Sequence, residues 1–80
     1  MILLEEVKID DYTLALFQGG FIRVYRGDEM LAEAIPGPYG PHEGVSFDRY
    51  TGGYMPSTLT AHLCDLFVAH DIWEGQFPAI

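Results

Sequence analysis

The sequence contains few cysteines and few basic residues, and each shortage excludes a class of protein. The single cysteine, Cys64, has no partner for an internal disulfide, which indicates a reducing compartment. We interpret Cys64 as a small buried hydrophobic residue; the alternatives are a nucleophile or a thiol that links two copies. Four Lys and Arg residues stand against twelve Asp and Glu residues, which gives a net charge of −8. Because phosphate binding requires Lys and Arg, we expect no direct contact with nucleic acid.

The chain also lacks a long hydrophobic run. Met1–Leu4 is apolar, but Glu5 and Glu6 follow at once, so this segment is too short and too acidic for a signal peptide. No other run approaches the length that crosses a membrane. We therefore expect a cytoplasmic protein without a membrane partner.

Motifs for catalysis, phosphate binding and metal binding are missing as well. Neither serine is flanked by a recognisable base motif, and the glycines of the 37–53 region do not precede the Lys and Ser or Thr of a phosphate loop. We predict no catalytic residue, no cofactor and no metal site. A competing hypothesis is a small metal-dependent or acid–base enzyme that uses His62, Asp65 and His70, although their spacing does not match a zinc motif.

What the chain does contain is typical of one small globular domain, which we assign to residues 1–80. Its composition is 49% hydrophobic and 14% aromatic, which separates it from disordered chains. Eighty residues are near the lower limit for a domain that folds without disulfides or metal.

Three turn signals predict an antiparallel meander. Gly19 and Gly20 separate two β-rich runs and predict the central hairpin, because a type I′ turn needs positive φ at both central positions. Asp10–Asp11 and Gly27–Asp28 predict a hairpin turn on either side. The predicted strands are Ile2–Ile9, Tyr12–Phe17, Phe21–Arg26 and Glu29–Ile35, with Pro36 ending the last, and Val45–Tyr50 as a short fifth strand at an edge.

The last predicted element is a helix that starts after Ser57 or Thr58 and ends at Gly75. Its apolar stripe consists of Leu59, Leu63, Leu66, Phe67, His70 and Trp73. An apolar stripe and an apolar sheet face bury each other most simply. We therefore predict an α+β fold, a four- to five-stranded antiparallel sheet (a β-meander) with one C-terminal helix packed on one face.

Counting outward from a two-residue Gly19–Gly20 turn assigns each strand residue to a face. The expected core face holds Leu3, Val7, Ile9, Tyr12, Leu14, Leu16, Phe21, Tyr25, Met30, Ala32 and Ala34, with Glu5 and Arg23 as its charged members. The centre of the other face is then expected to be apolar and rimmed by acids: Phe17, Ile22, Val24 and Leu31 surrounded by Glu6, Glu29 and Glu33. Such a patch indicates a protein contact, unless the 36–56 segment covers it.

The chain resembles the small acidic anti-CRISPR proteins of bacteriophages in its size, its charge and the order of its elements. The acids that carry the resemblance are Glu5, Glu6, Asp10, Asp11, Asp28, Glu29, Glu33, Glu43 and Asp48. The resemblance implies a non-enzymatic inhibitor in the host bacterial cytoplasm. It would bind a CRISPR effector complex and block its basic DNA-binding surface, either with carboxylates in the place of phosphates or as a steric wedge against the site.

The predicted partner-binding residues are Glu6, Asp10, Asp11, Phe17, Asp28, Glu29 and Glu33, with Phe17, Tyr39, Tyr50 or Tyr54 as the aromatic anchor. Arg23 and Arg26 interrupt the acidic pattern, which argues against a uniform DNA mimic. An alternative function is a structural or adaptor subunit of phage or bacterial origin. Such a subunit would self-associate, as a homodimer for example, through the second sheet face or an edge strand.

Overall fold

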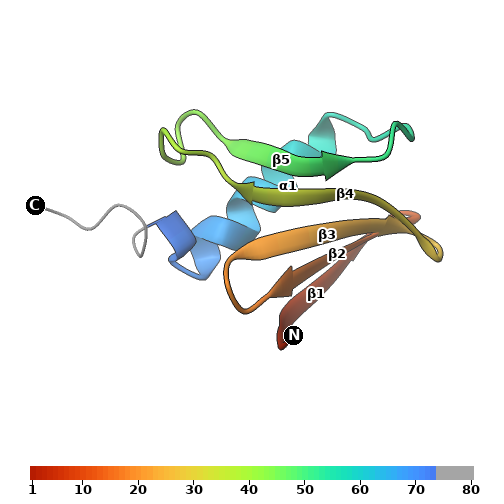
Figure 1. The fold of residues 1–80 in the computed structure, drawn as a ribbon, viewed down its shortest axis with the longest axis horizontal. Coiled ribbons are helices and arrows are strands. Elements are labelled where there is room, and N and C mark those ends of the chain that lie inside the picture. Colours follow the sequence, from red (N-terminus) through yellow and green to blue (C-terminus); the bar gives the residue numbers. More distant parts are fainter. Residues whose placement is uncertain (74–80) are drawn as a thin grey trace, which may run out of the picture.

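A computed structural model describes residues 1–73 of the chain. Its elements are β1 (Leu3–Ile9), β2 (Tyr12–Phe17), β3 (Phe21–Arg26), β4 (Glu29–Pro36), β5 (Val45–Tyr50) and α1 (Thr58–Ala69). The strands form one antiparallel sheet in chain order, with β1 and β5 at its edges (Figure 1). The predicted α+β meander and its fifth strand are confirmed. Within residues 1–73, no helix has the length and apolar character needed to span a membrane.

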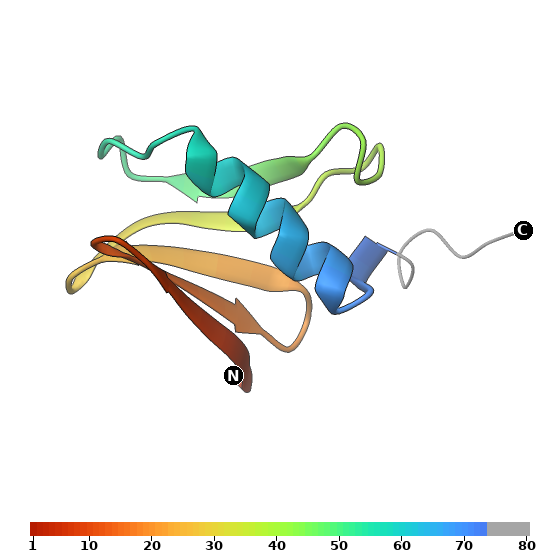
Figure 2. The same ribbon diagram turned by 180° about the vertical axis from the view of Figure 1, so that it is seen from behind.

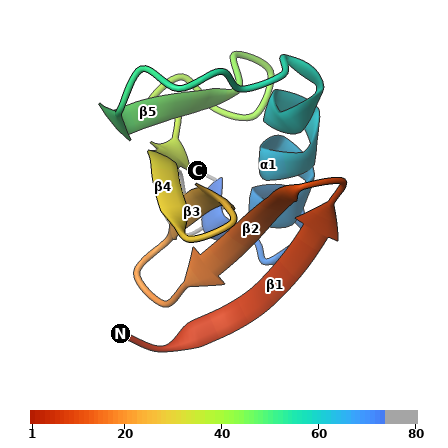
Figure 3. The same cartoon turned by 90° about the vertical axis from the view of Figure 1, so that its right-hand side faces the viewer.

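The sheet curves around α1. Seen from behind, the helix crosses the sheet diagonally (Figure 2). The view along the strands shows α1 inside the curve, with β1 and β5 on either side of it (Figure 3). One face of the sheet is therefore covered by the helix. We call the opposite face, which points away from α1, the outer face.

The core lies between the covered face and α1. The strands contribute four large, fully buried aliphatic side chains, Leu14, Leu16, Ile22 and Val24. The helix contributes Leu59, Leu63, Leu66 and Phe67, which confirms this part of the predicted stripe. Full burial of one such side chain stabilises a fold by about 1.5–3 kcal/mol, so this layer dominates the stability of the domain.

The C-terminal end of α1 differs from the prediction. Ser57 precedes the helix as expected, but α1 ends at Ala69, before the predicted end at Gly75, which lies outside the described residues. Asp71 adopts a left-handed conformation with φ of +55° and redirects the chain. Trp73 is nevertheless buried, and its indole N–H donates to the Gly37 carbonyl at 2.9 Å.

The turn between β2 and β3 contains one more residue than predicted. Phe17 pairs with Phe21, so the loop holds residues 18–20. The Gly20 N–H donates to the Phe17 carbonyl at 3.1 Å, and the φ angles of Gly19 and Gly20 are +107° and +85°. Both glycines have positive φ, as predicted, but in a three-residue loop that starts with a type II-like turn.

The extra loop residue reverses the two faces of β3. The predicted faces were wrong for this strand: Ile22 and Val24 are fully buried beneath α1, and Phe21 and Tyr25 lie on the outer face. The cost of burying a charge explains the observed register, because the predicted register would place Arg23 in the core. Burying an unpaired charge costs several kcal/mol, so the register that exposes Arg23 is favoured.

A β-bulge in β4 brings the next strand back to the predicted facing. Tyr25 pairs with Met30, but Val24 pairs with Ala32, which leaves Leu31 as the extra residue. Ala32 therefore faces the core as predicted. Leu31, predicted on the second face, is buried in the core, and Met30, predicted in the core, is only half-buried. The bulge is held from the β5 side, where Thr51 donates through N–H and Oγ to the Leu31 carbonyl.

The start of β1 also departs from the expected register. Val7 pairs with Leu14 as predicted, but the register shifts between Leu3 and Glu5, so that Leu3 pairs with Phe17. Leu3 was predicted in the core and is instead 47% exposed. The apolar residues Met1 to Leu4 all lie in solvent at this end of the edge strand.

Candidate functional site

A row of charged side chains runs across the outer face of the sheet. Strand pairing aligns Glu6, Ala15, Arg23, Glu33 and Arg49 in one continuous line from β1 to β5. The charges along this row alternate in sign around Ala15, and opposite charges on adjacent strands stabilise the sheet. The centre of the outer face is therefore electrostatically balanced, and it is not the apolar patch that the sequence predicted.

Arg23 contacts three side chains of the outer face: Glu33, Phe17 and Phe21. Its Nε donates to Glu33 Oε2 at 3.2 Å, and its guanidinium lies 5.6 Å from the ring centroids of both Phe17 and Phe21. The two rings are stacked at 5.3 Å. The hydrogen bond to Glu33, followed by the one to Tyr25, raises the pKa of Arg23. Phe17 and Glu33 are thus engaged within the protein, and Glu33 is not a free carboxylate.

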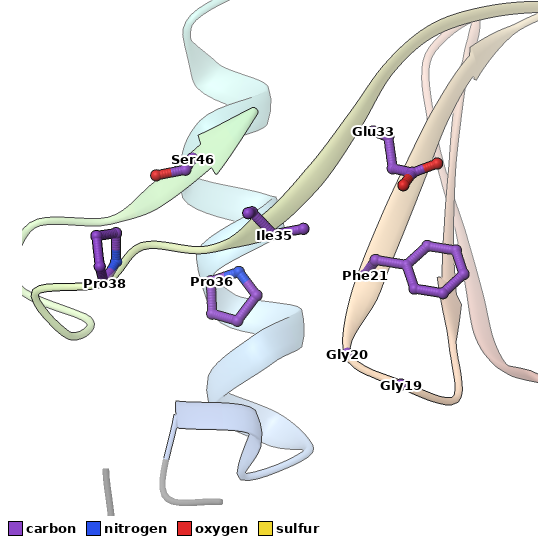
Figure 4. Close-up of a pocket in the computed structure, with 8 residues that line it drawn as sticks. All are labelled: Gly19, Gly20, Phe21, Glu33, Ile35, Pro36, Pro38 and Ser46. Carbon is purple, nitrogen blue, oxygen red and sulfur yellow. The ribbon is translucent and has the colours of Figure 1, made fainter. Parts of the chain in front are cut away.

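An open depression lies beside Phe21 on the outer face (Figure 4). Its volume is about 640 Å³, and it is lined by Gly19, Gly20, Phe21, Glu33, Ile35, Pro36, Pro38 and Ser46. The 37–44 and 51–57 segments do not lie over the outer face (Figures 1 and 3). The alternative in which the 36–56 segment covers this face is therefore not observed.

Four exposed acids lie at one end of the sheet, one of them, Glu29, directly across the strands from Arg26. The β1–β2 and β3–β4 turns both fall at this end, because alternate turns of a meander share a side (Figures 1 and 2). The two turns carry Asp10, Asp11, Asp28 and Glu29, all exposed. We call these four residues the acidic end. Arg26 lies between the turns, with its guanidinium 5.8 Å from the Tyr12 ring centroid.

Tyr54 is an exposed aromatic residue at the same end. The Tyr12 hydroxyl donates to the Tyr54 carbonyl at 3.4 Å, which ties the 51–57 segment to the start of β2. The Tyr54 side chain is 74% exposed. The Tyr50 hydroxyl already has a partner within the protein, because it donates to the Gly53 carbonyl at 2.7 Å. Tyr39 is exposed but lies on the β4–β5 connection, at the opposite end of the sheet.

The residues of the competing enzyme hypothesis lie on or just after α1. A groove of about 240 Å³ between β1 and α1 is lined by Glu5, Val7, His62, Asp65, Leu66 and Ala69. His70 lies with Nε2 2.7 Å from Glu5 Oε1, which joins the end of the helix to the edge strand. In residues 1–73, no three His, Cys, Asp or Glu side chains converge in a way that could hold a metal ion. The geometry gives the metal-dependent version of this hypothesis no support.

Cys64 packs against the core from the helix. Its side chain is half-buried, and its Sγ lies 3.8 Å from the Pro41 carbonyl. This position agrees with the interpretation as a small hydrophobic residue better than with a fully exposed linking thiol.

The predicted partner-binding residues separate into two groups. Asp10, Asp11, Asp28 and Glu29 come together at the acidic end. Glu6, Phe17 and Glu33 lie on the outer face instead. Phe21 and Tyr25 are outer-face residues that the sequence pattern placed in the core. Arg23 was the available signal, because a charge in the predicted core argues against that register.

Comparisons with protein-family models, with curated proteins and with solved structures found no match for the chain. The resemblance to anti-CRISPR proteins therefore stays a prediction.

Proposed function

We propose that this chain is a non-enzymatic inhibitor that binds a basic protein surface of a bacterial nucleic-acid-handling complex, of the anti-CRISPR type, and keeps nucleic acid from that surface. The observation that carries the proposal is the acidic end beside Tyr54. The host bacterial cytoplasm as the place of action belongs to the same proposal. We expect the contact surface of the partner to be one that normally binds phosphates.

Electrostatics supports this choice of partner. Two strand spacings separate the β1–β2 turn from the β3–β4 turn, about 10 Å, which is close to the Debye length of about 10 Å at 0.1 M salt. The fields of the two carboxylate pairs therefore add at the partner's surface. The net charge of −8 further raises the association rate with a cationic surface, and this effect weakens as salt screens it.

Tyr54 supplies the aromatic anchor that a specific contact needs in addition to charge. Charged rims steer binding, but most binding energy comes from a few desolvated aromatic or Arg side chains near the centre of an interface. Tyr54 is 74% exposed, and its backbone is held by Tyr12, so the ring is presented from an anchored segment. An anchored aromatic residue at the same end of the sheet as four carboxylates suits a basic surface that also offers an apolar pocket.

The test is inhibition of DNA binding by purified CRISPR effector complexes of several types, measured by mobility shift with increasing amounts of the chain. The acidic-end variant is D10N/D11N/D28N/E29Q, in which Asn at position 10 tolerates the observed φ of +53°. We expect the wild type to inhibit at least one complex, and the variant to need at least about tenfold more protein, since four charge contacts are lost.

A matched control removes four charges elsewhere. The variant E43Q/D48N/D65N/D71N also changes four exposed acids, and it gives the same net charge as the acidic-end variant. We expect the control to retain its inhibitory potency within about threefold. Equal losses in the two variants would contradict the acidic end as the site, and no inhibition of any effector would contradict the proposed function.

A further inference from the structure

The outer side of β1 is a free sheet edge. β1 pairs with β2 on one side, and no strand of residues 1–73 pairs on the other. An edge strand presents unpaired backbone N–H and C=O groups that can accept a further strand. We propose that a second copy of this chain occupies this edge, with the two β1 strands antiparallel and Glu6 of each copy opposite Lys8 of the other.

The regular part of the edge is short and well defined. The register shift between Leu3 and Glu5 is a bulge that interrupts the ladder. Asp10, with φ of +53°, ends the strand at the other side. The segment that can pair continuously is therefore Glu5–Ile9, which is exposed at Glu5, Glu6 and Lys8 and half-buried at Val7 and Ile9.

Hairpin geometry determines which residues of this segment can bind a new strand. Ile9 and Tyr12 flank a two-residue turn, so they exchange backbone hydrogen bonds with each other, as Val7 and its β2 partner also do. The intervening residues, Glu6 and Lys8, direct their backbone N–H and C=O groups toward the free edge. In a symmetric pair, each outward residue must face an outward residue of the second copy.

The charges select one of the three registers that meet this condition. Centring the pair on Glu6 places two glutamates opposite each other, and centring it on Lys8 places two lysines opposite each other; both arrangements are destabilising. Centring it on Val7 places Glu6 opposite Lys8 twice, once on each side of the two-fold axis. The regular edge is self-complementary in this register alone.

The rest of the fold is compatible with this arrangement. The Glu6–Lys8 contacts would extend the alternating row of the outer face, which already ends in Glu6 on β1. Because the two β1 strands run in opposite directions, the two acidic ends point to opposite ends of the dimer, and their repulsion is small. β5, the other edge, has a register shift opposite Glu33 and Ala34 near its middle, which interrupts its ladder.

The first experiment measures mass by sedimentation equilibrium over a concentration series. We expect the wild type to approach twice its 9.0 kDa mass. K8E places glutamates opposite each other and should weaken the dimer at least about tenfold, whereas the swap E6K/K8E restores both pairs and should dimerise like the wild type. R49E is the matched control, since it makes the same charge change on the opposite edge and should leave the dimer unchanged.

The second experiment tests the register. Val7 faces its own copy across the axis as a non-hydrogen-bonded pair, with Cα atoms about 4.5 Å apart, which lies within the range for a disulfide. V7C in a C64S background should form a covalent dimer under mild oxidation, and L3C in the same background should not. Circular dichroism checks that each variant is folded.

Two results would overturn the proposal. One is a wild-type mass that stays monomeric at every concentration. The other is a dimer that K8E does not weaken or that V7C does not link, because association would then use another surface.

Discussion

The two faces of this sheet are built from the same strands but hold different chemistry. On β3, Ile22 and Val24 are fully buried under α1, while Phe21 and Arg23, one residue away, lie half-buried on the outer face. Among the residues that the structure describes, no polar or charged residue is buried. The buried part of the covered face is apolar, and the outer face combines stacked rings with an ion pair.

We infer that burial under α1, rather than the length of the turn, selects which side of β3 faces inward. A face that is covered must exclude Arg23, whereas a face in water accepts it together with Glu33. The covered face therefore accounts for the stability of the domain. In the proposed function, recognition uses the exposed end of the sheet. Four experiments test this division, in order of decreasing expected effect.

The largest effect is expected from truncating adjacent residues on opposite faces of β3. Ile22→Ala leaves a cavity in the core and should lower the free energy of unfolding by about 2–5 kcal/mol. Phe21→Ala removes a half-buried ring and should cost less than Ile22→Ala, because only part of the side chain is buried; the stacking with Phe17 accounts for about 0.5–1.5 kcal/mol beyond the lost burial. Urea denaturation of both variants measures their free energies of unfolding. A larger loss for Phe21→Ala would mean that the faces of β3 are reversed.

A smaller effect is expected from removing the hydrogen bond that the Trp73 indole donates to the Gly37 carbonyl. Trp73→Phe keeps an aromatic ring but leaves the buried Gly37 carbonyl without its 2.9 Å partner. The free energy of unfolding should fall by about 1–3 kcal/mol, measured by thermal and urea denaturation. Tyr39→Phe, at an 82% exposed ring, is the control and should change stability very little. Equal effects would show that the indole bond contributes nothing.

The ion pair of the outer face should contribute less. Arg23 and Glu33 side chains are 28% and 17% exposed, so solvent screens their 3.2 Å contact. A double-mutant cycle with Arg23→Ala and Glu33→Ala should give a coupling free energy well below the effect of Ile22→Ala, and it should decline further in high salt. A coupling that is insensitive to salt would contradict a pair open to solvent.

The smallest effect is expected from deleting Gln18. Phe17 would still pair with Phe21, and Gly19–Gly20 would form a two-residue loop, which hairpins favour. The free energy of unfolding should change by about 1 kcal/mol or less, partly through loss of the Gln18 N–H bond to the Ile2 carbonyl. Cross-strand nuclear Overhauser contacts between Phe17 and Phe21 would report the register. Their loss would show that the three-residue loop itself sets the pairing.

Much of the fold could be predicted because it depends on local chemistry. The Asp10–Asp11 turn, the Gly27–Asp28 turn and the start of α1 agree with the prediction. The errors begin where one residue of loop length or one bulge changes the pairing. They are concentrated in β3 and around Leu31, where several backbone registers are locally acceptable.

The candidate site shows the same limit. Each acid of the acidic end was evident in the sequence, but their assembly with Tyr54 depends on two hairpins and a distant segment meeting at one end of the sheet. Phe21 and Arg23 were visible as well. Only the burial of Ile22 and Val24 shows that both belong to the outer face.

The sequence by itself determined which segments become strands, turns and helix, because glycine conformations, apolar periodicity and charge act over a few residues. The tertiary structure alone decided the register of β3 and the bulge at Leu31, since these depend on which side chains α1 can bury and which must remain in water. Local preferences do not distinguish such registers. The free energy of the completed core does.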